Sequence, residues 1–278
     1  MSLAERLTKG ELSRWLVALI LIPPVLLAVF MANKLVIFGV VGVMGAICWW
    51  EFAVNLLGRE RVGLLLLAVV GWLATAAGAL FYGPEGQGVG LALALGLGAF
   101  YLMRVLPEQA DRAVVNLISR YALGHLYLSF LLSFVFLIKQ EYFGNRWLFF
   151  VISITALTDT GAFYAGSRLK GPKLCPKVSP NKTISGLVGG CLTAVIAGAL
   201  SFSYLPPEFT RTSIMILSLV LAIWGSIGDL FESALKRAMG LKDTSGLLLG
   251  HGGLWDRLDS ILFNLPVVYF YISFQMAP

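Results

Sequence analysis

A polar stretch flanked by apolar sequence runs from Gly228 to Ser260 and reads GDLFESALKRAMGLKDTSGLLLGHGGLWDRLDS. It contains five of the 15 acidic residues of the chain, four basic residues and one of the two histidines. Ionisable groups beside membrane-spanning sequence are costly and usually serve a function. The stretch therefore predicts a polar site at a membrane surface that handles metal and phosphate.

The composition is that of an integral membrane protein. Of the 278 residues, 58% are hydrophobic and 13% are charged, whereas soluble domains carry about 25% charged residues. No hydrophilic block is long enough to fold alone, so we expect a single membrane domain over residues 1–278. Cytoplasmic loops account for the net charge of +6, and no basic soluble face exists that would bind nucleic acid.

About nine transmembrane helices are predicted, because a membrane span needs about 20 mostly apolar residues. The fold class is therefore all-α and polytopic. The spans are expected at residues 15–31, 35–57, 62–82, 89–106, 121–138, 147–166, 186–205, 213–231 and 260–276. Residues 107–120 are predicted to form a short amphipathic helix at the interface. The N-terminal spans cover about 15–138, and the C-terminal half covers about 147–278 with polar loops at 167–185 and 232–259.

Basic residues predict the orientation of the chain. With a cytoplasmic N-terminus, 17 of the 21 lysines and arginines fall on the cytoplasmic side, as the positive-inside rule requires. The C-terminus is then outside, and both polar loops face the cytoplasm. Glu51, after two tryptophans, is interpreted as an interfacial acid near the cytoplasmic end of the second span, with a role in a substrate pocket as the alternative. A bacterial cytoplasmic membrane is expected from the compact length and the absence of a targeting segment.

The first polar loop presents an acid, then lysines and hydroxyls. Asp159 lies inside or near the end of an apolar span, where an ionisable group is a functional candidate; the alternative is a pair with a basic residue such as Arg168. Lys177, Ser179 and Lys182 follow in a segment that three prolines stiffen, which suits phosphate binding. The alternative is an ordinary basic loop that contacts anionic lipid headgroups.

The second polar loop contains acids at helical spacing. Asp229 and Glu232 are three residues apart, as are Asp256 and Asp259, so on a helix each pair shares a face. Neighbouring carboxylates repel one another unless a cation joins them, and their oxygens suit Mg²⁺. The alternative is a network of salt bridges between helices. His251, among glycines, is interpreted as a proton carrier or phosphate donor, or else as a turn residue.

From Ser233 to Ser260 the sequence resembles the signature of the phosphatidate cytidylyltransferases (CDP-diacylglycerol synthases). The matching positions, with the spacing of the signature throughout, are Ser233, Lys236, Arg237, Lys242, Asp243, His251, Gly252, Gly253, Asp256, Arg257 and Asp259. Upstream, Asp159, the PKVSPNKT run over residues 176–183 and Gly186 are similar to the second polar block of that family.

Two positions depart from the family pattern. Leu249 stands where a proline or small residue usually precedes Gly-His, and Ser185 stands where many members have Glu or Gln. The first departure would loosen the turn that presents His251, and the second would remove one polar contact. Neither removes a candidate metal ligand.

The resemblance implies transfer of CMP from CTP to phosphatidic acid, which gives CDP-diacylglycerol and pyrophosphate. It implies dependence on Mg²⁺ or another divalent cation, membrane lipids as surroundings, and a homodimer. The implied metal ligands are Asp229, Asp256 and Asp259; of these Asp229 and Asp256 are the main ligands, and Asp259 assists together with Asp159. The implied catalytic residues are Asp229, Lys236, Arg237, Lys242, Asp243, His251, Asp256, Arg257 and Asp259. The implied substrate-binding residues are Asp159, Lys177, Ser179, Lys182, Thr183 and Ser233.

Other functions stay open at this point. An ion-coupled transporter would use Asp159 and Asp229 as intramembrane ion sites, and it would carry ion flux without CTP turnover. Another CTP-using lipid enzyme would be a polyprenol kinase or an archaeal-type lipid cytidylyltransferase. A kinase would release CDP, whereas a cytidylyltransferase releases pyrophosphate. A non-catalytic scaffold does not explain the mixed acidic and basic signature.

Overall fold

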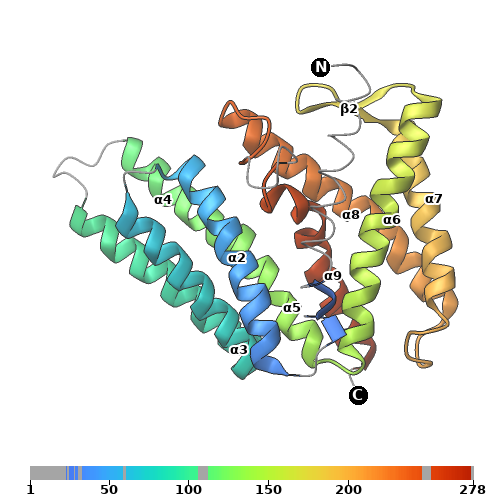
Figure 1. Ribbon diagram of the computed structural model, residues 1–278, viewed down its shortest axis with the longest axis horizontal. Helices are drawn as coiled ribbons and strands as arrows, with labels where there is room; N and C mark the ends of the chain where they lie inside the picture. The colour runs from blue at the N-terminus through green and yellow to red at the C-terminus, as the bar shows by residue number, and fades with distance from the viewer. Residues whose placement is uncertain are drawn as a thin grey trace. The chain divides into compact units, whose positions relative to one another are not determined.

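A computed structural model describes residues 23, 25–27, 29–30, 33–58, 61–105, 112–245 and 252–276. Within these residues the protein is helical apart from a short two-stranded sheet (Figure 1). Among the described residues, six helices are long and apolar enough to cross a membrane, at Lys34–Leu56, Val62–Val105, Val114–Gln140, Gly144–Leu169, Ile184–Ser201 and Arg211–Ala238. The chain is therefore an integral membrane protein. Most of the expected first span lies outside the described residues, and the count of nine and the orientation stay predictions.

The chain forms two compact units. The N-terminal unit comprises Met1–Ser133 and Asp243–Arg257, and the C-terminal unit comprises Phe134–Lys242 and Leu258–Pro278. The polar stretch from Gly228 to Ser260 is thus divided, because its middle belongs to the N-terminal unit and both of its ends belong to the C-terminal unit. The single membrane domain expected over residues 1–278 stays a prediction.

In the N-terminal unit, α2 (Lys34–Leu56) is followed by α3 (Val62–Val105). α3 consists of two helices that turn back at Gly83, whose φ of 68° and ψ of −152° are not helical. A Cβ on Gly90 would lie 2.6 Å from the carbonyl oxygen of Ala74, so the two halves run antiparallel in close contact. They correspond to the separate spans expected at 62–82 and 89–106.

A separate interfacial helix was expected at 107–120. Among the residues that the structure describes, its part from Arg112 onward is continuous with the next span. From Arg112 the chain is helical without a break through α4 (Arg112–Gly124), the π-helix η1 (His125–Phe130) and α5 (Leu131–Gln140). Val114–Gln140 is a single candidate span. The segment has a polar side in its first turns, which the sequence pattern alone does not separate from a surface helix.

In the C-terminal unit, α6 (Gly144–Leu169), α7 (Ile184–Ser201), α8 (Arg211–Ala238) and α9 (Asp259–Met276) pack together. α6 and α7 lie side by side (Figure 1), because small residues let their backbones approach. A Cβ on Gly190 would lie 3.0 Å from the carbonyl oxygen of Thr158.

The two expected polar loops are more ordered than predicted. In place of an irregular loop at 167–185, α6 continues to Leu169, and a hairpin of β1 (Lys173–Cys175) and β2 (Ser179–Thr183) precedes α7. In place of a loop from residue 232, α8 continues to Ala238. An i,i+4 ion pair between Glu232 and Lys236 stabilises this last part of the helix.

Candidate active site

Three carboxylates of the C-terminal unit gather near the start of α9. Asp229 and Glu232 lie one turn apart on α8, as their spacing predicts, and Asp259 is the first residue of α9. One oxygen of each lies within 4.8 Å of the others. Carboxylate oxygens at this spacing suit a hard divalent cation. Two of the three predicted metal ligands, Asp229 and Asp259, are therefore brought together, and Glu232 joins them.

Burial and mutual repulsion both act on this cluster. Burial raises the pKa of Asp259 to about 7, and the nearby charge of Asp229 adds to the rise. Glu232 is fully buried, and its carboxylate lies 2.7 Å from the ammonium of Lys236. A cation placed among these oxygens would lower the cost of ionising Asp259, since an opposite charge favours the charged form. The donor set thus fits a bound cation.

A lysine from the hairpin reaches the same cluster. The ammonium of Lys182, on β2, lies 2.5 Å from a carboxylate oxygen of Asp229. Ser233, one turn along α8, donates to the other oxygen of Asp229 at 3.5 Å. The hairpin therefore places a positive charge from the predicted phosphate loop beside the predicted metal ligands.

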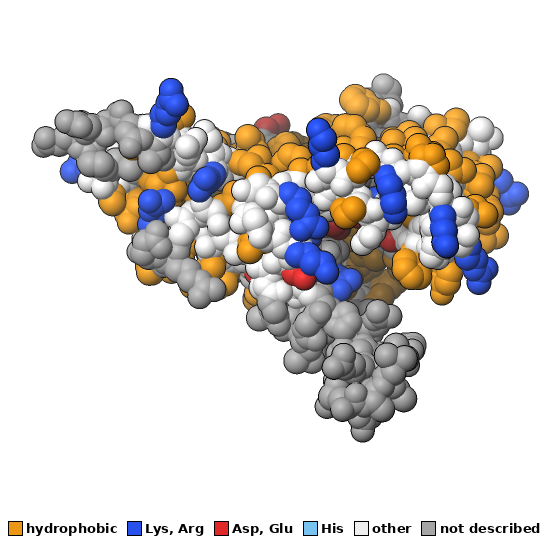
Figure 2. Space-filling model, turned by 90° about the horizontal axis from the view of Figure 1, so that it is seen from above, with side chains coloured by type: hydrophobic (Ala, Val, Ile, Leu, Met, Phe, Trp, Pro, Cys, Tyr) orange, Lys and Arg blue, Asp and Glu red, His pale blue; other side chains and the backbone are white. Residues whose placement is uncertain are grey.

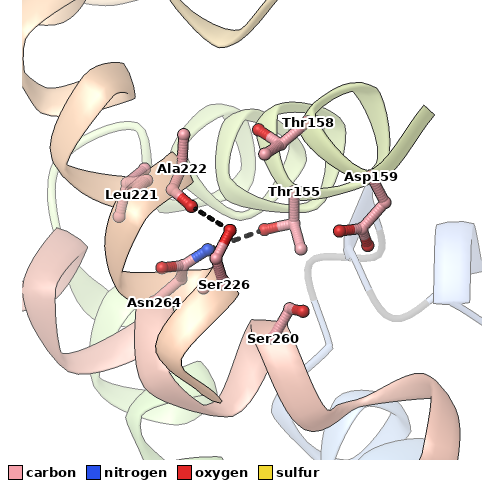
Figure 3. A pocket seen from close by; sticks show the side chains of 9 residues that line it. Thr155, Thr158, Asp159, Leu221, Ala222, Ser226, Ser260 and Asn264 are labelled. Atoms are coloured by element: carbon pink, nitrogen blue, oxygen red, sulfur yellow. Dashed lines mark hydrogen bonds between the residues drawn. The ribbon is translucent and has the colours of Figure 1, made fainter. Parts of the chain in front are cut away.

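A narrow cleft lies between α6, α8 and α9, and Ser260, the residue after Asp259, is part of its lining (Figure 3). Asp159 lines it from α6, together with the hydroxyl groups of Thr158 and Ser226, whose hydrogens are donated to backbone carbonyl oxygens. Thr158 donates to the carbonyl of Ile154, and Ser226 donates to that of Ala222, each at 2.7–2.8 Å. The cleft therefore presents lone pairs, which attract a cation or a hydrogen-bond donor.

Across the same cleft, the side chain of Asn264 projects from α9 (Figure 3). Its Nδ2 donates to the Oγ1 of Thr155 at 3.0 Å. Its buried Oδ1 accepts no hydrogen bond from the residues that the structure describes. Asn264 therefore adds another oxygen acceptor to the polar lining.

The other predicted ligand, Asp256, belongs to the N-terminal unit. It lies in the 3-10 helix η2 (Trp255–Arg257) and not on one helix with Asp259, so the predicted shared helical face is wrong. Its Oδ2 accepts from the backbone and hydroxyl of Thr244, at 3.1 and 3.0 Å, and from the backbone of Gly253 at 2.6 Å. This oxygen holds the local loop together.

Comparison with known proteins adds a family to this geometry. A family model described as "Cytidylyltransferase family" matches residues 12–275. The chain belongs to the cytidylyltransferase family. The phosphatidate cytidylyltransferase of Bacillus subtilis (strain 168) is 35% identical over 140 residues, which are 50% of this chain and 52% of that protein. Those of Staphylococcus saprophyticus and Staphylococcus aureus (strain COL) are 36% identical over 137 residues, 49% of this chain and 53% of theirs. The chain thus spans about half the length of the curated relatives it matches.

In this member of the cytidylyltransferase family, several predicted phosphate-binding residues have structural partners. Arg237 donates to the carbonyl oxygens of Val178 at 3.3 Å and Leu241 at 3.1 Å, so it ties the hairpin to the end of α8. Lys177 and Lys242 are exposed. Lysine and arginine side chains stand out on the surface drawn in Figure 2, with a few carboxylates among them.

Ser179 begins β2, Thr183 ends it, and Ser185 lies in the first turn of α7. Ser179 pairs with Cys175 across the sheet. The buried Thr183 accepts from the backbone of Gly186 at 3.1 Å and so caps α7. Ser185, one of the two departures from the family pattern, donates to the carbonyl oxygen of Lys170. These contacts give Thr183 and Ser185 a part in forming the hairpin.

Asp243, Arg257 and His251 are further side chains of the signature. Asp243 and Arg257 are exposed at the two ends of the segment that belongs to the N-terminal unit. His251 and Leu249 lie outside the described residues.

Glu51 has backbone partners far along the chain that its place in the sequence does not reveal. Glu51, interpreted from the sequence as an interfacial acid, is 4% exposed and is thus buried within the protein. Its carboxylate accepts from the backbone of Leu254 at 3.1 Å and of Trp255 at 2.9 Å, and from the hydroxyl of Ser245 at 2.6 Å. Its position inside an apolar span is the signal that marks such residues as candidates.

Proposed function

We propose that this protein is a phosphatidate cytidylyltransferase, which transfers CMP from CTP to phosphatidic acid and releases pyrophosphate. The observation that carries the proposal is the cluster of Asp229, Glu232 and Asp259 beside Lys182, in a membrane protein of the cytidylyltransferase family. Relatives named phosphatidate cytidylyltransferase supply the identity of the lipid substrate.

The proposed reaction joins two anions. An oxygen of the phosphatidic acid phosphate attacks the α-phosphorus of CTP. The bond from that phosphorus to the bridging oxygen then breaks, and pyrophosphate leaves. No general base is needed, because the attacking phosphate is already ionised near neutral pH, and His251 is accordingly not assigned as one. Positioning and charge neutralisation therefore dominate the catalytic task.

The residues of the chain divide this task. Lys182 and the exposed Lys177 and Lys242 bind phosphate oxygens and offset their charge. Asp229 and Asp259 would hold Mg²⁺ or another divalent cation, with Glu232 and Asp159 nearby. The cation would supply positive charge against the phosphates and fix their position. Asp256 is retained as a further ligand on the strength of the signature alone.

The proposal includes a place in the cell. One substrate is a lipid and the other is a soluble anion, so the site belongs at a membrane surface. The predicted orientation puts this surface on the cytoplasmic side of a bacterial inner membrane, where CTP is available. A homodimer is part of the proposal through the family resemblance.

Pyrophosphate release by the purified protein in detergent tests the proposed function. We expect release that requires CTP, phosphatidic acid and Mg²⁺ together, with CDP-diacylglycerol as the lipid product. Release of CDP in place of pyrophosphate would identify a lipid kinase. Turnover only with a different lipid acceptor would identify another cytidylyltransferase. Ion flux without any CTP turnover would identify a transporter.

A further inference from the structure

We propose that Glu51 is a positioning residue of the proposed active site. Through hydrogen bonds with Ser245, Leu254 and Trp255 it holds the backbone next to Asp256 against helix α2, and this inference rests on the proposed function. Glu51 belongs to neither polar block of the family resemblance. It lies about 200 residues before the loop that it holds.

Two residues of α2 bind the loop from one side of the helix. Glu51 accepts from the backbone N–H groups of Leu254 and Trp255 and from the Ser245 hydroxyl. Asn55, one turn later, donates to the carbonyl oxygen of Thr244 at 2.8 Å. Helix α2 therefore hydrogen-bonds residues 244–245 on one side and residues 254–255 on the other, mainly through their backbone.

The chemistry of the contact requires a carboxylate. Three donors converge on the two oxygens of Glu51, and a buried donor without an acceptor costs about 1–3 kcal/mol. Hydrogen bonds to an ionised acceptor are about twice as strong as those to a neutral one. A side chain that only filled space would be apolar at this depth, because burying an ionised carboxylate is costly without such donors.

The two glycines before Leu254 fit the same arrangement. A Cβ on Gly253 would collide with the Thr244 hydroxyl and would lie 2.5 Å from each carboxylate oxygen of Glu51, so only glycine lets the backbone approach that carboxylate. Gly252 has a φ of 79°, and a Cβ there would collide with Asp256. The pair of glycines in the signature is thus explained by two carboxylates, one from α2 and one from the loop itself.

Three consecutive backbone N–H groups connect Glu51 to Asp256. The backbone N–H of Gly253 donates to Asp256, and the next two backbone N–H groups donate to Glu51. A shift of the Glu51 carboxylate would therefore turn the peptide groups that orient Asp256. Since outer-shell partners of metal ligands are worth about 10–100-fold in metal affinity or activity, we expect an effect of that size.

The first test compares Glu51→Gln, which keeps the shape, with Ser245→Ala, which removes one donor only. The control is Glu85→Gln, the same chemical change at an exposed acid of the same unit. The readout is the Mg²⁺ concentration for half-maximal pyrophosphate release. We expect a rise of at least about tenfold for Glu51→Gln, a smaller rise for Ser245→Ala and none for the control. A variant with fewer folded molecules would release less pyrophosphate at an unchanged half-maximal Mg²⁺ concentration, and that outcome for Glu51→Gln would overturn the proposal.

The second test does not depend on activity. Amide hydrogen exchange at Leu254 and Trp255 reports whether their N–H groups remain bonded. We expect exchange at least about tenfold faster in Glu51→Gln than in the wild type. If the wild type releases no pyrophosphate, the proposed function fails, while faster exchange still supports the positioning of the loop by Glu51. Unchanged exchange would overturn it.

A double-mutant cycle then asks whether Glu51 and Gly253 act through one contact. Gly253→Ala brings a methyl group against the Glu51 oxygens and against the Thr244 hydroxyl, so we expect it to lower pyrophosphate release at least as much as Glu51→Ala does. The loss of pyrophosphate release in the double variant, expressed as a free energy, should be clearly smaller than the sum of the losses in the two single variants. Fully additive losses would mean that the two residues act independently, which contradicts the proposal.

Discussion

The ammonium of Lys182 lies 2.5 Å from a carboxylate oxygen of Asp229, and the two side chains are 26% and 28% exposed. The lysine comes from the hairpin, for which the sequence predicts phosphate binding. The acid comes from α8, where the sequence predicts a metal ligand. One ion pair thus joins both parts of the proposed chemistry. Because both groups keep contact with solvent, an anionic substrate can reach this lysine.

Replacing Lys182 by Gln tests its role in binding phosphate. We expect kcat/KM for CTP to fall by about tenfold to a hundredfold, because a charge-assisted contact to phosphate is lost. Steady-state pyrophosphate release measures the change. Lys173→Gln is the matched control, since Lys173 is an exposed lysine of the same hairpin and should retain its rate. Equal losses in the two variants would mean that only the total charge of the hairpin matters.

The acid cluster predicts how the protein responds to Mg²⁺. The pKa of Asp259 is raised to about 7, so stability from this group is present at low pH and lost as the pH rises through 7. At pH 8 without metal, Asp259→Asn should therefore raise the Tm by about 2–4 °C. Added Mg²⁺ should raise the Tm of the wild type but have less effect on this variant.

Thermal unfolding in detergent, with and without Mg²⁺, measures this response. Asp229→Asn should likewise weaken the stabilisation by Mg²⁺. Glu208→Gln, at an exposed acid of the same unit, should respond to Mg²⁺ as the wild type does. Equal stabilisation of all four proteins would show that the cation binds elsewhere.

Much of the fold follows from hydropathy and from glycine. The turn at Gly83 separates two apolar segments whose lengths each suit a membrane span, so both could be predicted. The end of α8 could not, because charged residues after an apolar span suggest a loop. The pairing of Glu232 with Lys236 stabilises the helix for further turns, and hydropathy does not include that interaction.

The candidate site could be predicted only where its residues share a motif or an element. The signature points to Asp229 and Asp259, although the spacing that pairs Asp259 with Asp256 on one helix does not hold, and the hairpin brings Lys182 to Asp229. Glu51 could not be matched to its partners, since backbone N–H groups leave no mark in the sequence. Nor does the spacing of Asp256 and Asp259 show that a 3-10 helix ends between them.

Asp256→Asn should destabilise the protein less than Asp256→Ala does, although neither variant should remain active. One oxygen of Asp256 accepts three hydrogen bonds, and the carbonyl oxygen of Asn can replace it in this role. Alanine leaves the donors of Thr244 and Gly253 without that acceptor, which should destabilise the protein by about 2–4 kcal/mol. Thermal unfolding and pyrophosphate release together separate the structural role from the catalytic one. Full activity in Asp256→Asn would remove it from the proposed metal ligands.

The antiparallel pair in α3 predicts opposite effects of one substitution at two nearby glycines. A Cβ on Gly90 would lie 2.6 Å from the Ala74 carbonyl oxygen and from the Cα of Thr75, whereas a Cβ on Gly88 would meet no atom within 4 Å. Gly90→Ala should therefore destabilise the protein by about 1–3 kcal/mol through overpacking. Gly88→Ala should stabilise it by up to about 1 kcal/mol, because alanine favours the helix. Thermal unfolding of the two variants in the same detergent measures both effects, and equal stability of the two would contradict the close packing of the helices around the Gly83 turn.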